Sequence, residues 1–162
     1  MIIFISVFSF LLDGILSKYL IKTIFAPMLT IVSLVIIYPY FNNNNYRYLK
    51  YNAIIGLLYD IVYMDTIFYN FFLFLIIGLI VIIFNYLYSS NCYISLIETI
   101  ISIIFYRFID YGFVIIFRNY SFSFSNLLES IYSSMTLNII YCLIIYIIAN
   151  KYSKKHHILR SK

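Results

Sequence analysis

The chain has 162 residues, of which 64% are hydrophobic and 10% are charged, and its formal net charge is +5. This composition excludes an ordinary soluble globular domain, in which about half of the residues are apolar and about a quarter are charged. A helix that crosses a bilayer needs about 20 mainly apolar residues. The sequence therefore predicts an all-α integral membrane protein with a single domain of six transmembrane helices over residues 1–150.

Polar clusters divide the chain into six apolar segments, which we predict to be helices. Open sheet edges cannot face lipid, and the sequence lacks the alternation of barrel strands. The third segment is short for a full span, so we expect it to tilt or the bilayer to thin around it. The first segment has no basic leader, which favours a span over a cleaved signal peptide. The segments cover residues 2–21, 25–41, 51–64, 67–88, 93–117 and 127–149.

Basic residues gather outside the apolar segments, in a connector and in a tail. The connector over 42–50 carries Arg47 and Lys50, and the tail over 151–162 carries five Lys or Arg residues. Basic loops of membrane proteins stay in the cytoplasm, so an even number of spans predicts that both termini are cytoplasmic. Anionic lipid head groups attract such charges. We therefore expect these basic residues to contact the lipid bilayer and not a nucleic acid.

The acidic residues indicate where a site lies, because all six fall in or beside apolar segments. A charge at a helix centre costs about 3 kcal/mol on insertion scales, so such groups tend to face the bundle interior or a wet cavity. In the predicted topology four of the six map toward the outer half of the membrane, which predicts a polar groove that opens outward. The six residues are Asp13, Asp60, Asp65, Glu98, Asp110 and Glu129.

Asp60 stands at the centre of the predicted groove. Gly56 precedes it by one helical turn, and a small residue there lets a neighbouring helix approach close to the carboxylate. The alternative is a buried, hydrogen-bonded aspartate that serves only to lock the bundle together.

The other polar residues also have structural interpretations. Arg107 and Asp110 are one turn apart and can pair on one helix face, either within the groove or as a bridge that only stabilises the fifth helix. Asn126 and Glu129 form a capping-box pattern at a helix start. Asp65 marks the turn between the third and fourth segments.

Catalytic and metal-binding signatures are missing from the sequence. It has no glycine-rich phosphate loop, no H-E-x-x-H and no G-x-S-x-G. Cys92 and Cys142 lack metal-ligand spacing, and His156 and His157 lie in the basic tail, where a solvated pair is more common than a metal site. We therefore expect no enzymatic activity, no cofactor and no metal ion.

The stretch around Asp60 resembles the signature of the rod shape-determining protein MreD family. "GLLYD" at 56–60, followed by "TIFYNFFLFLIIGLIV" at 66–81, is similar to that family's G-L-x-x-D segment, turn and long apolar helix ending in glycine. Three motif positions fall on Gly56, Leu57 and Asp60. Asn70 matches the polar position after the turn, and Gly78 matches the helix glycine. The turn itself departs from the family, because "YMDTIFY" lacks the glycines commonly found there.

The resemblance implies a non-enzymatic scaffold of the cell-wall elongation machinery, located in the bacterial inner membrane. The implied partners are MreC and, through it, the RodA glycosyltransferase, a class B penicillin-binding protein and the cytoplasmic MreB filaments. The implied fold is similar to the substrate-binding subunits of energy-coupling-factor transporters. An alternative function is a small-solute, vitamin-type binding subunit of such a transporter. In either case the candidate polar groove, partner-binding or structural, comprises Gly56, Asp60, Asn70, Arg107 and Asp110.

Overall fold

Every regular element in the described part of the chain is helical, which confirms the all-α prediction. The computed structural model describes residues 2–20, 27–42, 44–63, 68–88, 91–118 and 122–155. Asp65, His156 and His157 lie outside these ranges. The elements are α1 (Ile2–Leu20), α2 (Leu29–Ile37), the 3-10 helix η1 (Tyr38–Phe41), α3 (Asn45–Tyr63), α4 (Tyr69–Leu87), α5 (Cys92–Arg118) and α6 (Phe124–Lys155).

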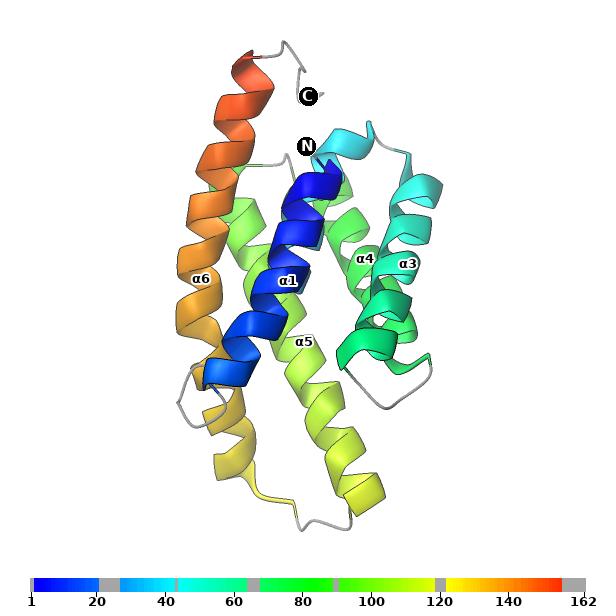
Figure 1. Cartoon of the computed structure of the whole chain (residues 1–162), viewed down its shortest axis with the longest axis vertical. Helices are drawn as coiled ribbons and strands as arrows, with labels where there is room; N and C mark the ends of the chain where they lie inside the picture. The colour runs from blue at the N-terminus through cyan, green and yellow to red at the C-terminus, as the bar shows by residue number, and fades with distance from the viewer. Residues whose placement is uncertain are drawn as a thin grey trace.

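The helices form a bundle in which α3, α4, α5 and α6 alternate in direction (Figure 1). α3 packs against α4 and α5 packs against α6, while α2 contacts α1, α4, α5 and α6. The start of α1 and the end of α6 lie at the same end of the bundle, together with η1 and the first turns of α3. We call this the terminal end of the molecule.

Four of the described helices, α1, α4, α5 and α6, are long and apolar enough to cross a membrane. The segment Leu29–Phe41 is apolar but short, because its 13 residues cover about 20 Å at a helical rise, against about 30 Å of hydrocarbon. α3 has 19 residues, but polar residues such as Arg47 and Lys50 occupy its first turns. The described part of the chain therefore contains four helices that are long and apolar enough to span a membrane, whereas the sequence predicted six.

Residues 45–50 belong to helix α3, which corrects the prediction that 42–50 is a connector. Asn42 ends η1 in the left-handed conformation, with a φ of 50°. Asn44 then accepts a hydrogen bond at its Oδ1 from the backbone N–H of Arg47, at 3.1 Å. This is the contact of a helix N-cap. α3 therefore begins at Asn45 instead of residue 51.

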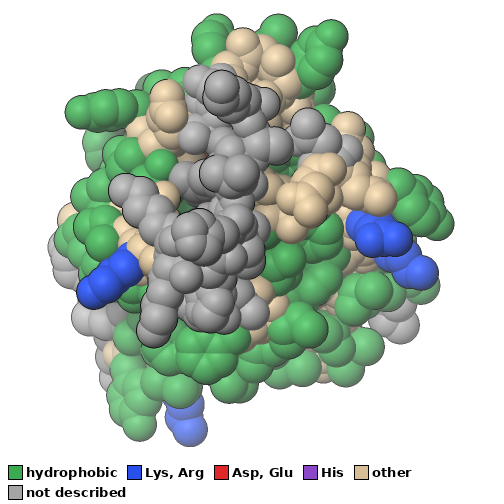
Figure 2. Space-filling view, turned by 90° about the horizontal axis from the view of Figure 1, so that it is seen from above, with side chains coloured by type: hydrophobic (Ala, Val, Ile, Leu, Met, Phe, Trp, Pro, Cys, Tyr) green, Lys and Arg blue, Asp and Glu red, His purple; other side chains and the backbone are tan. Residues whose placement is uncertain are grey.

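The terminal end carries basic side chains. Arg47 and Lys50 lie in the first turns of α3, and Lys151 lies near the end of α6. Figure 2 views the molecule from this end, and the charged side chains that it shows in colour are Lys and Arg. The described part of the chain therefore has a basic surface at the same end as its termini.

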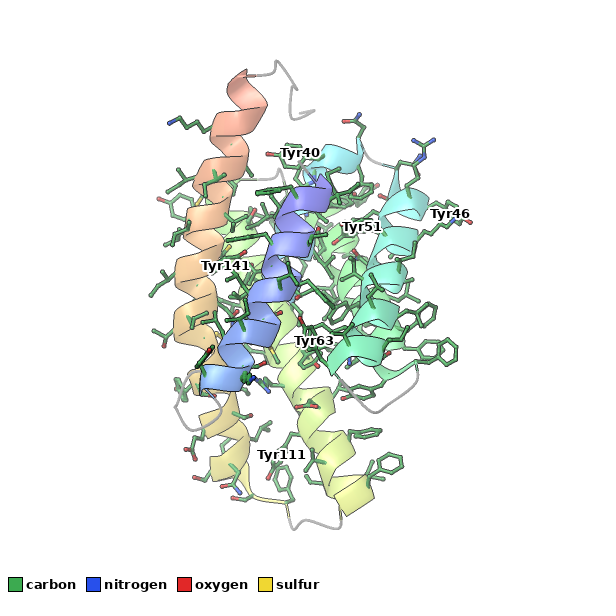
Figure 3. The ribbon with its side chains drawn as sticks, viewed as in Figure 1. Tyr40, Tyr46, Tyr51, Tyr63, Tyr111 and Tyr141 are labelled. Carbon is green, nitrogen blue, oxygen red and sulfur yellow. The ribbon has the colours of Figure 1, made fainter. Side chains whose placement is uncertain are left out.

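Tyrosine hydroxyls join helices that are distant in the sequence. Tyr63 of α3 donates a hydrogen bond to the carbonyl of Phe10 in α1 at 2.7 Å. The hydroxyls of Tyr141 in α6 and Ser9 in α1 lie 2.7 Å apart. Tyr63 and Tyr141 thus approach α1 from opposite sides (Figure 3). Each ring buries apolar surface while its hydroxyl finds a partner, as buried tyrosines require.

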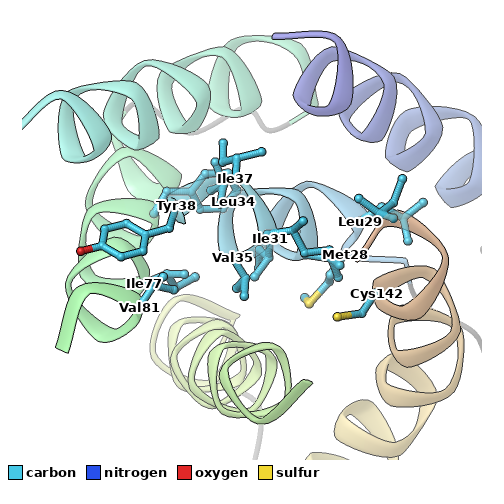
Figure 4. Packing of buried hydrophobic residues seen from close by; sticks show 14 of the residues in the cluster. Met28, Leu29, Ile31, Leu34, Val35, Ile37, Tyr38, Ile77, Val81 and Cys142 are labelled. Atoms are coloured by element: carbon cyan, nitrogen blue, oxygen red, sulfur yellow. The ribbon is translucent and has the colours of Figure 1, made fainter. Parts of the chain in front are cut away.

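α2 forms the core of the bundle, because all nine of its residues are buried. Its sequence, "LTIVSLVII", offers apolar side chains in every direction, and a helix that is apolar on all sides is buried in protein or in lipid. Here it lies between α1, α4, α5 and α6 (Figure 4). Ile31, Leu34 and Val35 pack inside this ring of helices. The second apolar segment is therefore a central helix surrounded by protein.

We predict that Ile36→Ala in α2 lowers the free energy of unfolding by about 2 to 5 kcal/mol, the usual cost of truncating a large core side chain to alanine. Ile36 is fully buried, whereas Ile61 in α3 is 78% exposed. The matched variant Ile61→Ala should change stability by less than about 0.5 kcal/mol.

Thermal unfolding in detergent can be followed with a thiol-reactive dye, because Cys142 is buried in the folded bundle. An equal loss of unfolding free energy in Ile36→Ala and Ile61→Ala would contradict the central position of α2.

Candidate functional site

Asp60 caps the start of α4. Its Oδ1 accepts hydrogen bonds from the backbone N–H of Asn70 at 3.0 Å and from Asn70 Nδ2 at 2.9 Å. Its Oδ2 accepts the backbone N–H of Phe71 at 3.1 Å. The first turn of a helix has N–H groups without intrahelical partners, and negative charge is stabilised at that end of the helix dipole. The carboxylate of α3 therefore satisfies two backbone donors of α4 in the interior, where Asp60 is 2% exposed.

Gly56 makes this cap possible by allowing the two helices to touch. A Cβ atom at Gly56 would lie 2.6 Å from the carbonyl oxygen of Asn70 and 2.8 Å from the Cα of Phe71. Residues four apart share one face of a helix, so Gly56 and Asp60 both point toward the start of α4. The missing side chain brings the α4 backbone close enough for the Asp60 carboxylate to reach it.

Asn70 links this junction to α5. While its Nδ2 donates to Asp60, its Oδ1 accepts a hydrogen bond from the hydroxyl of Tyr106 at 2.9 Å. Asn70 and Tyr106 are both buried. Sequence reasoning missed Tyr106, since nothing in the pattern distinguishes it from the other 18 tyrosines of the chain. Hydrogen bonds among Asp60, Asn70 and Tyr106 thus join α3, α4 and α5.

Arg107 and Asp110 form a second contact, on α5. Arg107 Nη1 lies 3.6 Å from Asp110 Oδ2, and the two side chains are 16% and 29% exposed. Arg107 Nε also donates to Ser134 Oγ in α6 at 2.6 Å. The predicted pairing is confirmed. Of the five candidate residues, the structure thus brings Gly56, Asp60 and Asn70 together at one junction, and Arg107 and Asp110 together in an ion pair beside α6.

Asp13 makes a cap of the same kind for α2. Its Oδ1 accepts the backbone N–H of Leu29, and its Oδ2 accepts that of Thr30, both at 2.7 Å. The Thr30 hydroxyl also donates to Oδ2, and Asn138 Oδ1 accepts the N–H of Met28 at 3.0 Å. The central helix therefore begins inside the bundle with three backbone donors satisfied by side chains of α1 and α6.

A small cavity beside Asp13 lies near both networks. Its volume of about 10 Å³ is about the minimum that holds one water molecule. Its walls include Asp13, Thr30, Tyr59, Phe74 and Tyr106. This space offers no room for a vitamin-sized solute, since ligand pockets usually measure about 300 to 1,000 Å³.

The remaining described acids differ from one another. Glu98 is buried, and its Oε1 accepts a hydrogen bond from Asn85 Nδ2 at 2.6 Å. Glu129 is exposed. The capping-box interpretation of Asn126 and Glu129 is wrong, because α6 begins at Phe124 and so Asn126 already lies inside the helix.

Asp13 and Asp60 join neighbouring helices through hydrogen bonds. Both carboxylate oxygens of Asp13 and of Asp60 accept backbone hydrogen bonds. Among the described residues, no group of three or more His, Cys, Asp or Glu side chains is placed to bind a metal ion. No protein-family model, curated protein or solved structure matches this chain.

We expect Gly56→Ala to destabilise the bundle by about 1 to 3 kcal/mol, because the new methyl group meets backbone atoms of α4 and forces the two helices apart. The control is Gly112→Ala in α5, where nothing lies within 4 Å of the added Cβ. That variant should keep or slightly raise stability, by up to about 1 kcal/mol, because alanine favours helix more than glycine does. A loss at Gly112 equal to that at Gly56 would contradict the close approach.

Replacing either capping aspartate by alanine should cost about 1 to 3 kcal/mol, because buried N–H groups lose their acceptors. This applies to Asp13→Ala and to Asp60→Ala. Asp60→Asn should fall between wild type and Asp60→Ala, since the amide keeps one acceptor oxygen. Glu129→Ala, at an exposed position, serves as the control. Unfolding midpoints in detergent measure all four variants, and stability unchanged by Asp60→Ala would exclude the capping role.

Proposed function

We propose that this protein is a non-enzymatic membrane scaffold of the MreD type. In this proposal it crosses the bacterial inner membrane with six helices and binds MreC. Through MreC it links the RodA glycosyltransferase and a class B penicillin-binding protein to the cytoplasmic MreB filaments, and so contributes to rod shape.

The observation that carries this proposal is the junction of Gly56, Asp60 and Asn70. These residues occupy positions of the motif that resembles the MreD signature, and in the structure they contact one another. The glycine, the aspartate and the polar residue after the turn therefore perform one task, which is to join α3 to the start of α4. A shared structural task supports the interpretation of these three residues as one motif.

The arrangement of charge supports the proposed orientation. Arg47, Lys50 and Lys151 lie at the end that holds both termini. Basic residues beside membrane spans favour the cytoplasmic side. We accordingly place the terminal end in the cytoplasm, facing the MreB filaments, and the junction between α3 and α4 in the outer half of the membrane.

The proposed six spans combine the four apolar helices with α3 and α2. α3 packs against α4, which is itself a candidate span, and its polar first turns suit the membrane interface. α2 begins inside the bundle at Asp13 and continues through η1 to the terminal end. A helix that is too short to cross the hydrocarbon alone is tolerated at membrane depth when protein surrounds it and its backbone groups are satisfied.

Binding is the mechanism that we propose. Asp60 holds α3 and α4 in register from inside the bundle, while Arg107 and Asp110 are the more accessible members of the candidate site. A membrane-proximal helix of MreC, docked against the outer half of α5, would contact this pair together with the exposed apolar side chains of Phe108 and Ile116. The role of the junction is thus to shape the surface on which the partner binds.

The solute-binding alternative requires a pocket in the outer half. The cavity beside Asp13 has room for about one water molecule. A larger cavity, of about 450 Å³, is lined by residues of η1, the start of α3 and the end of α4, and so lies at the terminal end. In the proposed orientation that is the cytoplasmic side, where an importer does not collect its solute.

Co-purification from detergent tests the proposal. We expect MreC from the same cells to be recovered with the wild-type protein and its recovery to fall several-fold with Asp110→Ala. The matched control, Glu129→Ala, removes an exposed acid from α6 and should retain MreC. Size-exclusion profiles establish that each variant remains folded.

Failure of the wild-type protein to recover MreC, together with retention of a small solute, would favour the transporter subunit. Equal recovery with both variants would remove the Arg107–Asp110 pair from the partner surface.

A further inference from the structure

The cavity at the terminal end is separate from the candidate groove and has the size of a ligand site. Its volume is about 450 Å³, within the range of about 300 to 1,000 Å³ that is usual for small-molecule pockets. Its walls come from η1, the first turn of α3 and the last two turns of α4. In the orientation proposed above, the helix ends that form it lie where the bilayer changes from hydrocarbon to head groups.

One side of the cavity opens toward lipid. Ile83, Tyr86 and Leu87 of α4 line it and are 56%, 88% and 64% exposed. α4 is a candidate membrane span, so these exposed side chains face the bilayer and not bulk water. A tyrosine among aliphatic residues at the end of a span is typical of the membrane interface. An occupant from the bilayer can therefore enter from the side, with its acyl chains along α4.

The polar side chains that line the cavity include two amides, Asn85 and Asn45. Asn85 Nδ2 donates to the carbonyl of Val81 at 3.0 Å and to Glu98 Oε1 at 2.6 Å. Both partners are acceptors, which fixes the orientation of the amide and leaves Asn85 Oδ1 as an acceptor for a ligand. Asn45 Oδ1 accepts the hydroxyl hydrogen of Tyr38 at 2.9 Å, which leaves Asn45 Nδ2 as a donor.

These groups select among lipid head groups by their chemistry. A primary ammonium group can donate to Asn85 Oδ1 and is attracted by the carboxyl group of Glu98 behind it. A phosphate oxygen can accept from Asn45 Nδ2. A quaternary ammonium has no N–H to donate, and a phosphoglycerol head group brings no cation to the Asn85 side. We propose that this cavity binds the phosphoethanolamine head group of a membrane phospholipid.

Lipid binding by the full-length protein in detergent tests this proposal. Native mass spectrometry can compare phosphatidylethanolamine, phosphatidylcholine and phosphatidylglycerol with identical acyl chains. We expect the ethanolamine lipid to bind about fivefold or more tightly than the choline lipid, the ratio expected when one hydrogen bond is lost. The variants Asn85→Leu and Asn45→Leu should each weaken its binding by a similar factor.

Tyr93→Ala is the matched control for Tyr86→Ala, because both tyrosines are exposed near the terminal end and Tyr86 lines the cavity. The first variant should bind the lipid as wild type does, and the second should bind it more weakly. Asn45 is exposed, so Asn45→Leu keeps the test valid if Asn85→Leu does not fold.

Three results would overturn the proposal. The first is equal binding of the three lipids, and the second is ethanolamine-lipid binding that neither asparagine variant weakens. The third is displacement of the lipid by an equal concentration of soluble O-phosphoethanolamine, which would identify the occupant as a free solute. The basic side chains of this end attract anionic lipids non-specifically, and such binding should not change in the cavity variants.

Discussion

The structure depends on the need to satisfy every backbone N–H group at the start of a helix that begins inside an apolar bundle. Neither lipid nor an apolar core supplies hydrogen bonds, so an unpaired backbone donor costs several kcal/mol there. Asp13 and Asp60 answer this need for α2 and α4. Each buried carboxylate in turn gains donors and the positive end of a helix dipole. A buried carboxylate and a buried helix start, each unfavourable by itself, thus stabilise each other.

The same arrangement explains why the helices pack in this order. An acid in α1 caps α2, and an acid in α3 caps α4, so each pair is joined by a carboxylate that reaches the following helix. Asn138 extends the first cap to α6, and the bond from Tyr106 to Asn70 extends the second to α5. Asp60, the acid at the centre of the predicted groove, therefore acts first as an internal connection. The function that we propose uses the outer surface that these connections shape, and the cavity proposed to bind a lipid lies at the opposite end.

Much of the helical framework could be predicted from the apolar segments, and the spacing of Gly56 and Asp60 indicated a close helix contact beside an acid. The burial of α2 could not be predicted, because lipid and protein interior are equally apolar and a run such as "LTIVSLVII" suits both. The cap by Asp13 could not be predicted either, because Asp13 precedes Leu29 by 16 positions and no local pattern links the two residues. Tyr106 is one of 19 tyrosines, and only the fold selects it.

Hydrogen–deuterium exchange at single-residue resolution is the most direct test of the capping account. First-turn amides of a helix normally exchange quickly because they lack intrahelical acceptors. The account predicts that the amides of Leu29, Thr30, Asn70 and Phe71 are as strongly protected as those in the middle of the same helices, and much more than the first-turn amides of Ser125 and Asn126 in α6. Rapid exchange at Asn70 and Phe71, equal to that at Ser125 and Asn126, would contradict it.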